Sequence, residues 1–266
     1  MLKSIRETLE VVIHRLAYPL LPYPSVCYVI LSNGRTGSNF LVSLLSSHPQ
    51  IHQYGEVIGE SLLRMPGFQE KIQRAGVSRY VQNCFRKRFY RKAVGMKFLY
   101  NQLLKGYAKR WNVGQGAAVL EFLRRHPELR ILHLKRRNRL KILVSFEIAK
   151  LTREYVIKDP ASPRREMPVT LTPEQCQSFF KTIRENESFI ESCFQPHQIK
   201  VLYYEDLASD TAAQCREILD FLELPPYELK SNIYKQSNKL LSERIQNYRE
   251  LKDFFQGTES AAFFKD

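Results

Sequence analysis

The chain has 266 residues, of which 44% are hydrophobic and 26% are charged, and its formal net charge is +14. This length and composition suit one sizeable globular domain and exclude a chain that is disordered throughout. Lys and Arg are concentrated between Arg64 and Arg110, where Glu70 is the only acid. Such a basic stretch attracts nucleotides, acidic glycans and other polyanions, although a solvated basic surface explains it equally well.

Cysteine usage and the N-terminal pattern indicate the cellular setting. The five cysteines are scattered without metal-ligand spacing, which favours a reducing compartment over a disulfide framework. Residues 1–16 carry apolar side chains at helical spacing, so we expect residues 1–24 to form an amphipathic helical extension. No apolar run is long enough to span a bilayer. A cytoplasmic enzyme is therefore predicted, with peripheral membrane contact through residues 1–16 as a secondary hypothesis.

Strand and helix patterns alternate along the rest of the chain. Residues 26–32 are predicted to form a buried strand, and a helix is expected from Ser38 to just before Pro49. This alternation predicts a single α/β domain over residues 25–266, with a central, mostly parallel sheet flanked by helices. Further strands are expected at 93–99, 130–135 and 199–204, and helices at about 116–127, 140–156, 173–194 and 211–222.

A glycine-rich loop, NGRTGSN at residues 33–39, joins the first strand to the first helix. Its glycines permit a tight turn, and the N–H groups at the start of the helix then face an anion, so a P-loop-like phosphate-binding loop is expected. A nucleotide or sugar kinase is the main alternative, but its GxxxxGK[ST] pattern needs a lysine where Ser38 follows Gly37. A purely structural turn is the other alternative.

Residues 29–56, VILSNGRTGSNFLVSLLSSHPQIHQYGE, resemble the 5′-phosphosulfate loop of sulfotransferases that use 3′-phosphoadenosine 5′-phosphosulfate (PAPS). The resemblance is strongest to bacterial carbohydrate enzymes of the nodulation-factor and trehalose type, and it extends over about residues 26–255. It implies PAPS as the donor substrate, no metal requirement, and a carbohydrate or glycolipid hydroxyl as the acceptor. The loop residues that it assigns to PAPS binding are Arg35, Thr36, Gly37, Ser38 and Asn39.

The same resemblance implies a second half of the donor site. In the family an Arg and a Ser eight residues apart bind the 3′-phosphate, and here Arg137 and Ser145 have that spacing after a predicted strand. Arg136 is the alternative to Arg137. The segment KQSNKLLSERIQNYREL resembles the part that closes over the nucleotide, which suggests Gln236 and Ser237 as further contacts.

Catalysis by such an enzyme needs a general base and a cation at the leaving phosphate oxygen. Glu56 resembles the carboxylate that serves as the base in the bacterial carbohydrate enzymes, and His52 is the second candidate. Arg35 is the natural stabiliser of the leaving group. Lys97 is expected at the end of its strand near the same site, where it would contact the acceptor or the donor sulfate or, equally, form a salt bridge. A non-enzymatic module that binds nucleic acid or membrane would explain the charge but not the loop or the Arg137–Ser145 pair, and nucleic acid is not expected as a partner.

Overall fold

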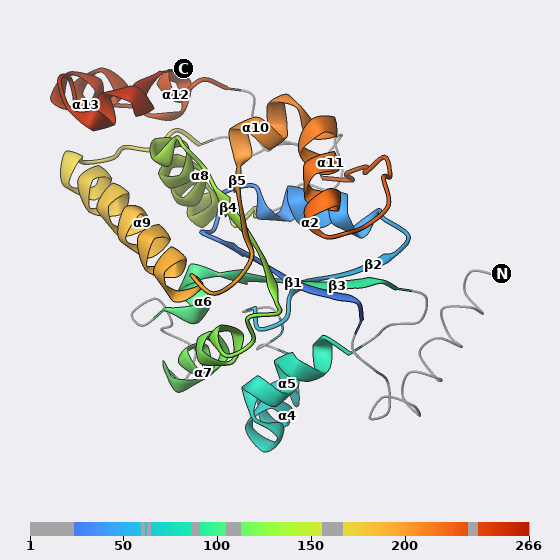
Figure 1. Cartoon of the computed structure of the whole chain (residues 1–266). Coiled ribbons are helices and arrows are strands. Elements are labelled where there is room, and N and C mark those ends of the chain that lie inside the picture. The colour runs from blue at the N-terminus through green and yellow to red at the C-terminus, as the bar shows by residue number, and fades with distance from the viewer. Residues whose placement is uncertain are drawn as a thin grey trace.

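The structure is a computed structural model that describes residues 24–59, 62, 65–86, 91–104, 113–155, 167–233 and 239–265. The expected N-terminal extension lies outside these residues except for Pro24, so its helix and its membrane contact stay predictions. The described residues are organised around one sheet of five parallel strands, which confirms the predicted α/β fold (Figure 1). The strands are β1 (Val26–Ser32), β2 (Ile51–Glu56), β3 (Ala93–Leu99), β4 (Arg130–Lys135) and β5 (Ile199–Tyr203).

The strand order β2-β3-β1-β4-β5 puts β1 in the middle of the sheet. The chain first fills one side of β1 with β3 and β2, and then crosses over to place β4 and β5 on the other side. The order therefore reverses between β1 and β4, where Ser32 pairs with Leu134. Because both strands end at the same edge, the loops that follow them lie there, at the usual ligand position of an open α/β sheet, which we call the crevice.

Helices cover both faces of the sheet. On one face, α2 (Ser38–Ser46), α10 (Tyr204–Ser209) and α11 (Thr211–Phe221) share a hydrophobic cluster with the sheet. The opposite face is covered by helices on the other side of the sheet in Figure 1, which share a second cluster. They are α4 (Phe68–Ala75), α5 (Val77–Cys84), α6 (Tyr100–Leu103) and α7 (Val113–Arg124).

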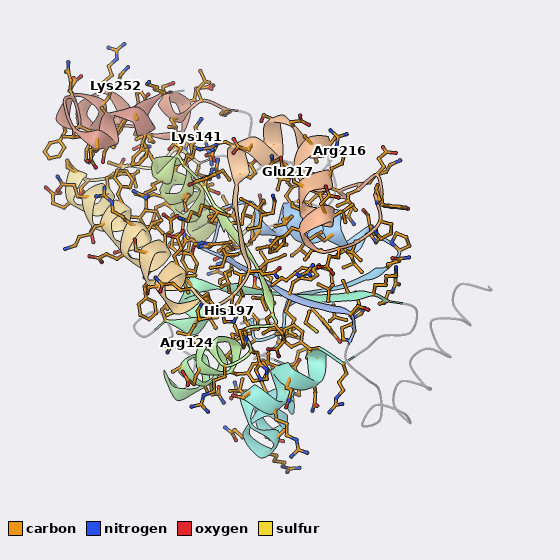
Figure 2. All side chains as sticks on the ribbon, viewed as in Figure 1. Arg124, Lys141, His197, Arg216, Glu217 and Lys252 are labelled. Atoms are coloured by element: carbon orange, nitrogen blue, oxygen red, sulfur yellow. The ribbon has the colours of Figure 1, made fainter. Side chains whose placement is uncertain are left out.

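A third hydrophobic cluster lies beside the sheet, where α8 and α9 pack against the C-terminal segments. The long helix α9 begins with a capping box between Thr172 and Gln175, and Pro173 occupies its first turn, where proline is favourable. The connection after α9 is tied to α7, because the ring of His197 donates to the carbonyl of Leu123 at 3.0 Å (Figure 2). The helices of this cluster are α8 (Arg139–Thr152), α9 (Pro173–Cys193), α12 (Leu241–Arg244), α13 (Tyr248–Phe254) and the 3₁₀ helix η2 (Glu259–Phe264).

Several elements were not predicted from the sequence. The edge strand β2 has the polar sequence IHQYGE, which lacks the apolar run typical of a buried parallel strand. The helices α4, α5, α12 and α13 each have eight residues or fewer, too few for their periodicity to stand out. Within the described part of the chain, no helix combines the length and apolar character needed to cross a bilayer.

Candidate active site

The segment that joins β1 to α2 is a tight loop with two residues in the left-handed backbone region. Arg35 has a φ of 68° and Gly37 has a φ of 87°, and Gly37 directly precedes α2. The buried hydroxyl of Thr36 donates to the carbonyl of Asn33 at 2.8 Å and closes the turn. In the described residues α2 has no side-chain cap and no acid in its first turn, so the positive end of its dipole faces the loop uncompensated. The buried Ser38 opens this helix, and the whole arrangement suits an anion.

Arg35 connects this loop to α8, although the two segments are far apart in the sequence. Its Nε atom donates to Oγ of Ser145 at 3.1 Å, and its Nη1 atom donates to the carbonyl of Tyr155 at 2.7 Å. Burial, and next the nearby positive charge of Arg136, lower the pKa of Arg35 to about 10. An anion bound near both of these partly buried arginines would offset the repulsion between their charges. Ser145 of α8 and Arg136, which follows β4, therefore lie beside Arg35 of the loop.

The two arginines that follow β4 point in different directions. Nη1 of Arg136 donates to the carbonyl of Arg35 at 3.2 Å, and only 16% of the Arg136 side chain is exposed. Arg137 instead forms a two-point ion pair with Asp206, at 2.6 and 2.8 Å, above the ring of Tyr203. The hydrogen bonds of this pair raise the pKa of Arg137 and lower that of Asp206. In this structure Arg136 thus lies against the loop, whereas Arg137 is half-exposed and already paired.

The ring of Tyr204 supports the loop from the side of α10. A Cβ atom at Gly37 would lie 2.3 Å from Cδ2 of this ring, so only glycine permits the contact. On the same ring lies the guanidinium of Arg136, with its Cζ atom 4.6 Å from the ring centroid. Tyr204 was not among the site residues predicted from the sequence, although its position was a usable signal: it directly follows β5, the neighbour of β4 at the same sheet edge.

Glu56 lies at the carboxyl end of β2, beside a buried lysine. The register of β2 against β3 shifts between Gln53 and Glu56, and this irregularity pairs Glu56 with Lys97. The Nζ atom of Lys97 lies 2.9 Å from Oε1 of Glu56 and also donates to Oδ1 of Asn39 in the first turn of α2. The other carboxylate oxygen accepts from Nε2 of Gln102 at 2.7 Å. One lysine therefore connects the carboxylate to the helix that follows the glycine-rich loop, and Lys97 forms the salt bridge that was one of its expected roles.

His52 lies on the other face of the sheet from Lys97. It pairs with Val94, which belongs to the cluster under α4–α7. Its ring contacts the edge of the Tyr54 ring, at 4.4 Å between centroids, and Tyr54 packs on the same cluster. The structure thus brings Glu56, but not His52, to the side of the sheet that carries α2. Gln236 and Ser237 lie outside the described residues, and their predicted contacts stay predictions.

Strand β4 carries a buried histidine, His133. Nε2 of His133 is 2.5 Å from the hydroxyl of Tyr100, and only 1% of the His133 side chain is exposed. Burial, and then the charge of Lys135, lower the pKa of His133 to about 4, so the imidazole is neutral at neutral pH. Across the described ranges, no group of three or more His, Cys, Asp or Glu residues is placed to hold a metal ion.

Most of the chain is similar in sequence to known proteins. Residues 28–228 match the model of the Sulfotransferase family. The chain is 26% identical over 251 residues to Nodulation protein H of Rhizobium meliloti strain 1021, covering 91% of this chain and 96% of that protein. It is 25% identical over 269 residues to Nodulation protein H of Rhizobium tropici, with coverages of 92% and 95%. A crystal structure of a sulfotransferase from Alicyclobacillus acidocaldarius is similar with a TM-score of 0.47 and 15% identity, covering 88% of this chain and 92% of that one.

Proposed function

Since this chain belongs to the sulfotransferase family and is a PAPS-dependent sulfotransferase, we propose that it sulfates a carbohydrate or glycolipid hydroxyl with Glu56 as the general base. The family match over residues 28–228 includes the loop, β2, β4 and α8, which carry most of the proposed site residues. It also removes the kinase alternative and the non-enzymatic alternative, because neither accounts for membership of this family.

In the proposed reaction the acceptor oxygen attacks sulfur in line with the leaving 5′-phosphate. The new bond forms between that oxygen and sulfur, the bond from sulfur to the phosphate oxygen breaks, and Glu56 takes the hydroxyl proton. The products are a sulfate ester and 3′-phosphoadenosine 5′-phosphate (PAP). Arg35 and the N–H groups at the start of α2 would stabilise the charge that grows on the phosphate, and one such donor typically contributes about 3–4 kcal/mol.

The observation that carries the choice of base is the link from Glu56 through Lys97 to Asn39. It ties the carboxylate to the first turn of α2, beside the loop that would bind the phosphosulfate. A carboxylate suits the weakly acidic hydroxyl of a sugar, and 29% of the Glu56 side chain is exposed, so an acceptor can reach it. His52 instead pairs with Val94, and its ring packs against Tyr54 on the other face of the sheet.

For the donor phosphates, we propose that the loop residues and Ser145 bind PAPS together. The hydrogen bond between Arg35 and Ser145 supports this, because it places the two side chains next to each other, where one ligand can contact both. Arg137 remains the proposed ligand of the 3′-phosphate on the resemblance, with Arg136 as the alternative that lies against the loop. No metal is proposed to take part.

Turnover with radiolabelled PAPS and a panel of sugars, a glycolipid and a simple phenol tests this proposal. Glu56→Gln is expected to lower kcat by about 10²–10⁴-fold and to leave PAP binding unchanged, since the base acts only on the acceptor proton. The matched control is His52→Gln on the same strand, for which turnover should stay within a factor of three. Loss of turnover in the control together with a normal Glu56→Gln enzyme would transfer the role to His52, and exclusive sulfation of the phenol would contradict the proposed acceptor class.

A further inference from the structure

Gln102 is a buried glutamine in α6, the short helix that directly follows β3. We propose that Gln102 is a positioning residue for sulfuryl transfer, which fixes the orientation of the Glu56 carboxylate toward the acceptor. This inference rests on the proposed role of Glu56 as the base. Its basis is the pair of hydrogen bonds made by the Gln102 amide and the packing that holds the backbone of α6 in place.

The two ends of the Gln102 amide have different partners. Oε1 accepts from the backbone N–H of Leu99 at 3.0 Å, and Nε2 donates to Oε2 of Glu56 at 2.7 Å. Because a backbone N–H can only donate, it requires the oxygen end of the amide on its own side. The donor end is therefore left to face Glu56, and the amide cannot reverse without losing both bonds.

The backbone that carries this amide is also held. A four-residue helix is not stable by itself, so α6 depends on its neighbours. The neighbour is α7, in which a Cβ atom at Gly116 would lie 2.3 Å from the carbonyl oxygen of Gln102. Glycine at this position lets α7 pack directly against the Gln102 backbone, while Leu103 anchors α6 in the hydrophobic cluster. Gln102 thus approaches Glu56 from a fixed support.

The carboxylate of Glu56 is consequently gripped at both oxygens, with Lys97 at Oε1 and Gln102 at Oε2. Lys97 alone would allow the carboxylate to rotate about its contact with the ammonium group, whose donors have no fixed plane. The second, directional bond from Gln102 removes that freedom. A base held in one orientation keeps its reacting oxygen within reach of the acceptor hydroxyl, and small misplacements of a reacting group typically cost up to about 10²-fold in rate.

The first test is a double-mutant cycle between Gln102→Met and Glu56→Gln. Methionine keeps the size of the side chain but has no amide, so kcat should fall about 10–100-fold while KM for PAPS and Kd for PAP stay within twofold. In the Glu56→Gln background the same substitution should change kcat by less than about twofold, because no base remains to be positioned. Equal losses in both backgrounds, or an unchanged kcat in the first, would overturn the proposal.

Two further variants separate positioning from packing. In Gln102→Glu, one side-chain oxygen can still accept from the N–H of Leu99, but a second oxygen replaces the Nε2 group that donates to Glu56. The kcat of this variant should therefore fall at least as far below the wild-type value as that of Gln102→Met. Leu103→Met changes the neighbouring buried side chain of α6 without touching Glu56 and should keep kcat within twofold. A Gln102→Glu enzyme with normal turnover, or a Leu103→Met enzyme with the same loss as Gln102→Met, contradicts the inference.

A crystal structure of Gln102→Met with PAP gives a readout that needs no acceptor. The Glu56 carboxylate is expected to adopt a second orientation, in which Oε2 no longer lies where the wild-type bond held it. An unchanged, single orientation would overturn the inference even in an active enzyme. If instead the wild-type protein sulfates no acceptor in the panel, the proposed function fails, and this structural comparison still decides the role of Gln102.

Discussion

Replacing Gly37 with alanine tests whether the Tyr204 ring, which lies between Gly37 and the Arg136 guanidinium, keeps the glycine-rich loop in place. We call this arrangement of Gly37, Tyr204 and Arg136 the stack. The substitution forces an ordinary residue to adopt a φ of 87°, which costs about 1–2 kcal/mol. The added Cβ atom also meets Cδ2 and Cε2 of Tyr204 at 2.3 and 2.7 Å, so the ring has to move. Overpacking of this kind costs about 1–3 kcal/mol, and together the two effects predict a loss of about 2–5 kcal/mol in the free energy of unfolding.

The functional consequence follows from what rests on the ring. Because the Arg136 guanidinium lies on Tyr204 and donates to the Arg35 carbonyl, a displaced ring disturbs both arginines of the crevice. We expect the affinity for PAP, measured by calorimetry, to fall about tenfold or more, and urea unfolding to give the loss of stability. In a Tyr204→Ala background the clash disappears, so Gly37→Ala should then cost only the backbone strain.

Gly34→Ala is the matched control in the same loop. A Cβ atom there meets nothing within 4 Å, and Gly34 is not among the described residues with positive φ. This variant should stay within about 0.5 kcal/mol of the wild type and bind PAP normally. If Gly37→Ala behaves like Gly34→Ala, the stack does not support the loop and the reasoning is refuted.

The remaining predictions concern Arg137 and His133. If Arg137 leaves Asp206 to bind the 3′-phosphate, Arg137→Ala should weaken PAP binding about 10–100-fold in calorimetry, because a charge-assisted hydrogen bond contributes about 1.5–3 kcal/mol. An unchanged Kd in this variant, together with weaker PAP binding in Arg136→Ala, would assign the 3′-phosphate site to Arg136. His133 has a pKa lowered from 6.5 to about 4 in the folded protein, so its contribution to stability is complete above pH 6.5 and is lost as the pH falls from 6.5 through 4. The lowering corresponds to about 3 kcal/mol. Between pH 7.5 and 4, the free energy of unfolding measured with urea should therefore fall by about 3 kcal/mol less in His133→Gln than in the wild type. An equal fall in the two proteins would contradict this prediction.

Local sequence was sufficient for the elements whose signal lies within a few residues. The apolar strand at 26–32, the glycine loop and the helix from Ser38 form a continuous pattern, and the structure has β1, the loop and α2 at those positions. The family resemblance pointed to the segment with Arg137 and Ser145, and in the structure Ser145 and Arg136 of this segment contact Arg35, whereas Arg137 pairs with Asp206. The polar edge strand β2 had no such local signal, since its place is set by pairing with β3.

The amino-acid sequence by itself was enough to predict the family, the parallel sheet and the position of the glycine-rich loop, because each shows in residue types at short spacing. Only the tertiary structure decided which side chains meet in the crevice. Glu56 reaches Lys97 because the register of β2 shifts before it, and Gln102 reaches Glu56 because α7 packs closely against α6. These contacts depend on strand order and on the register in which neighbouring strands pair, and a local sequence pattern gives neither.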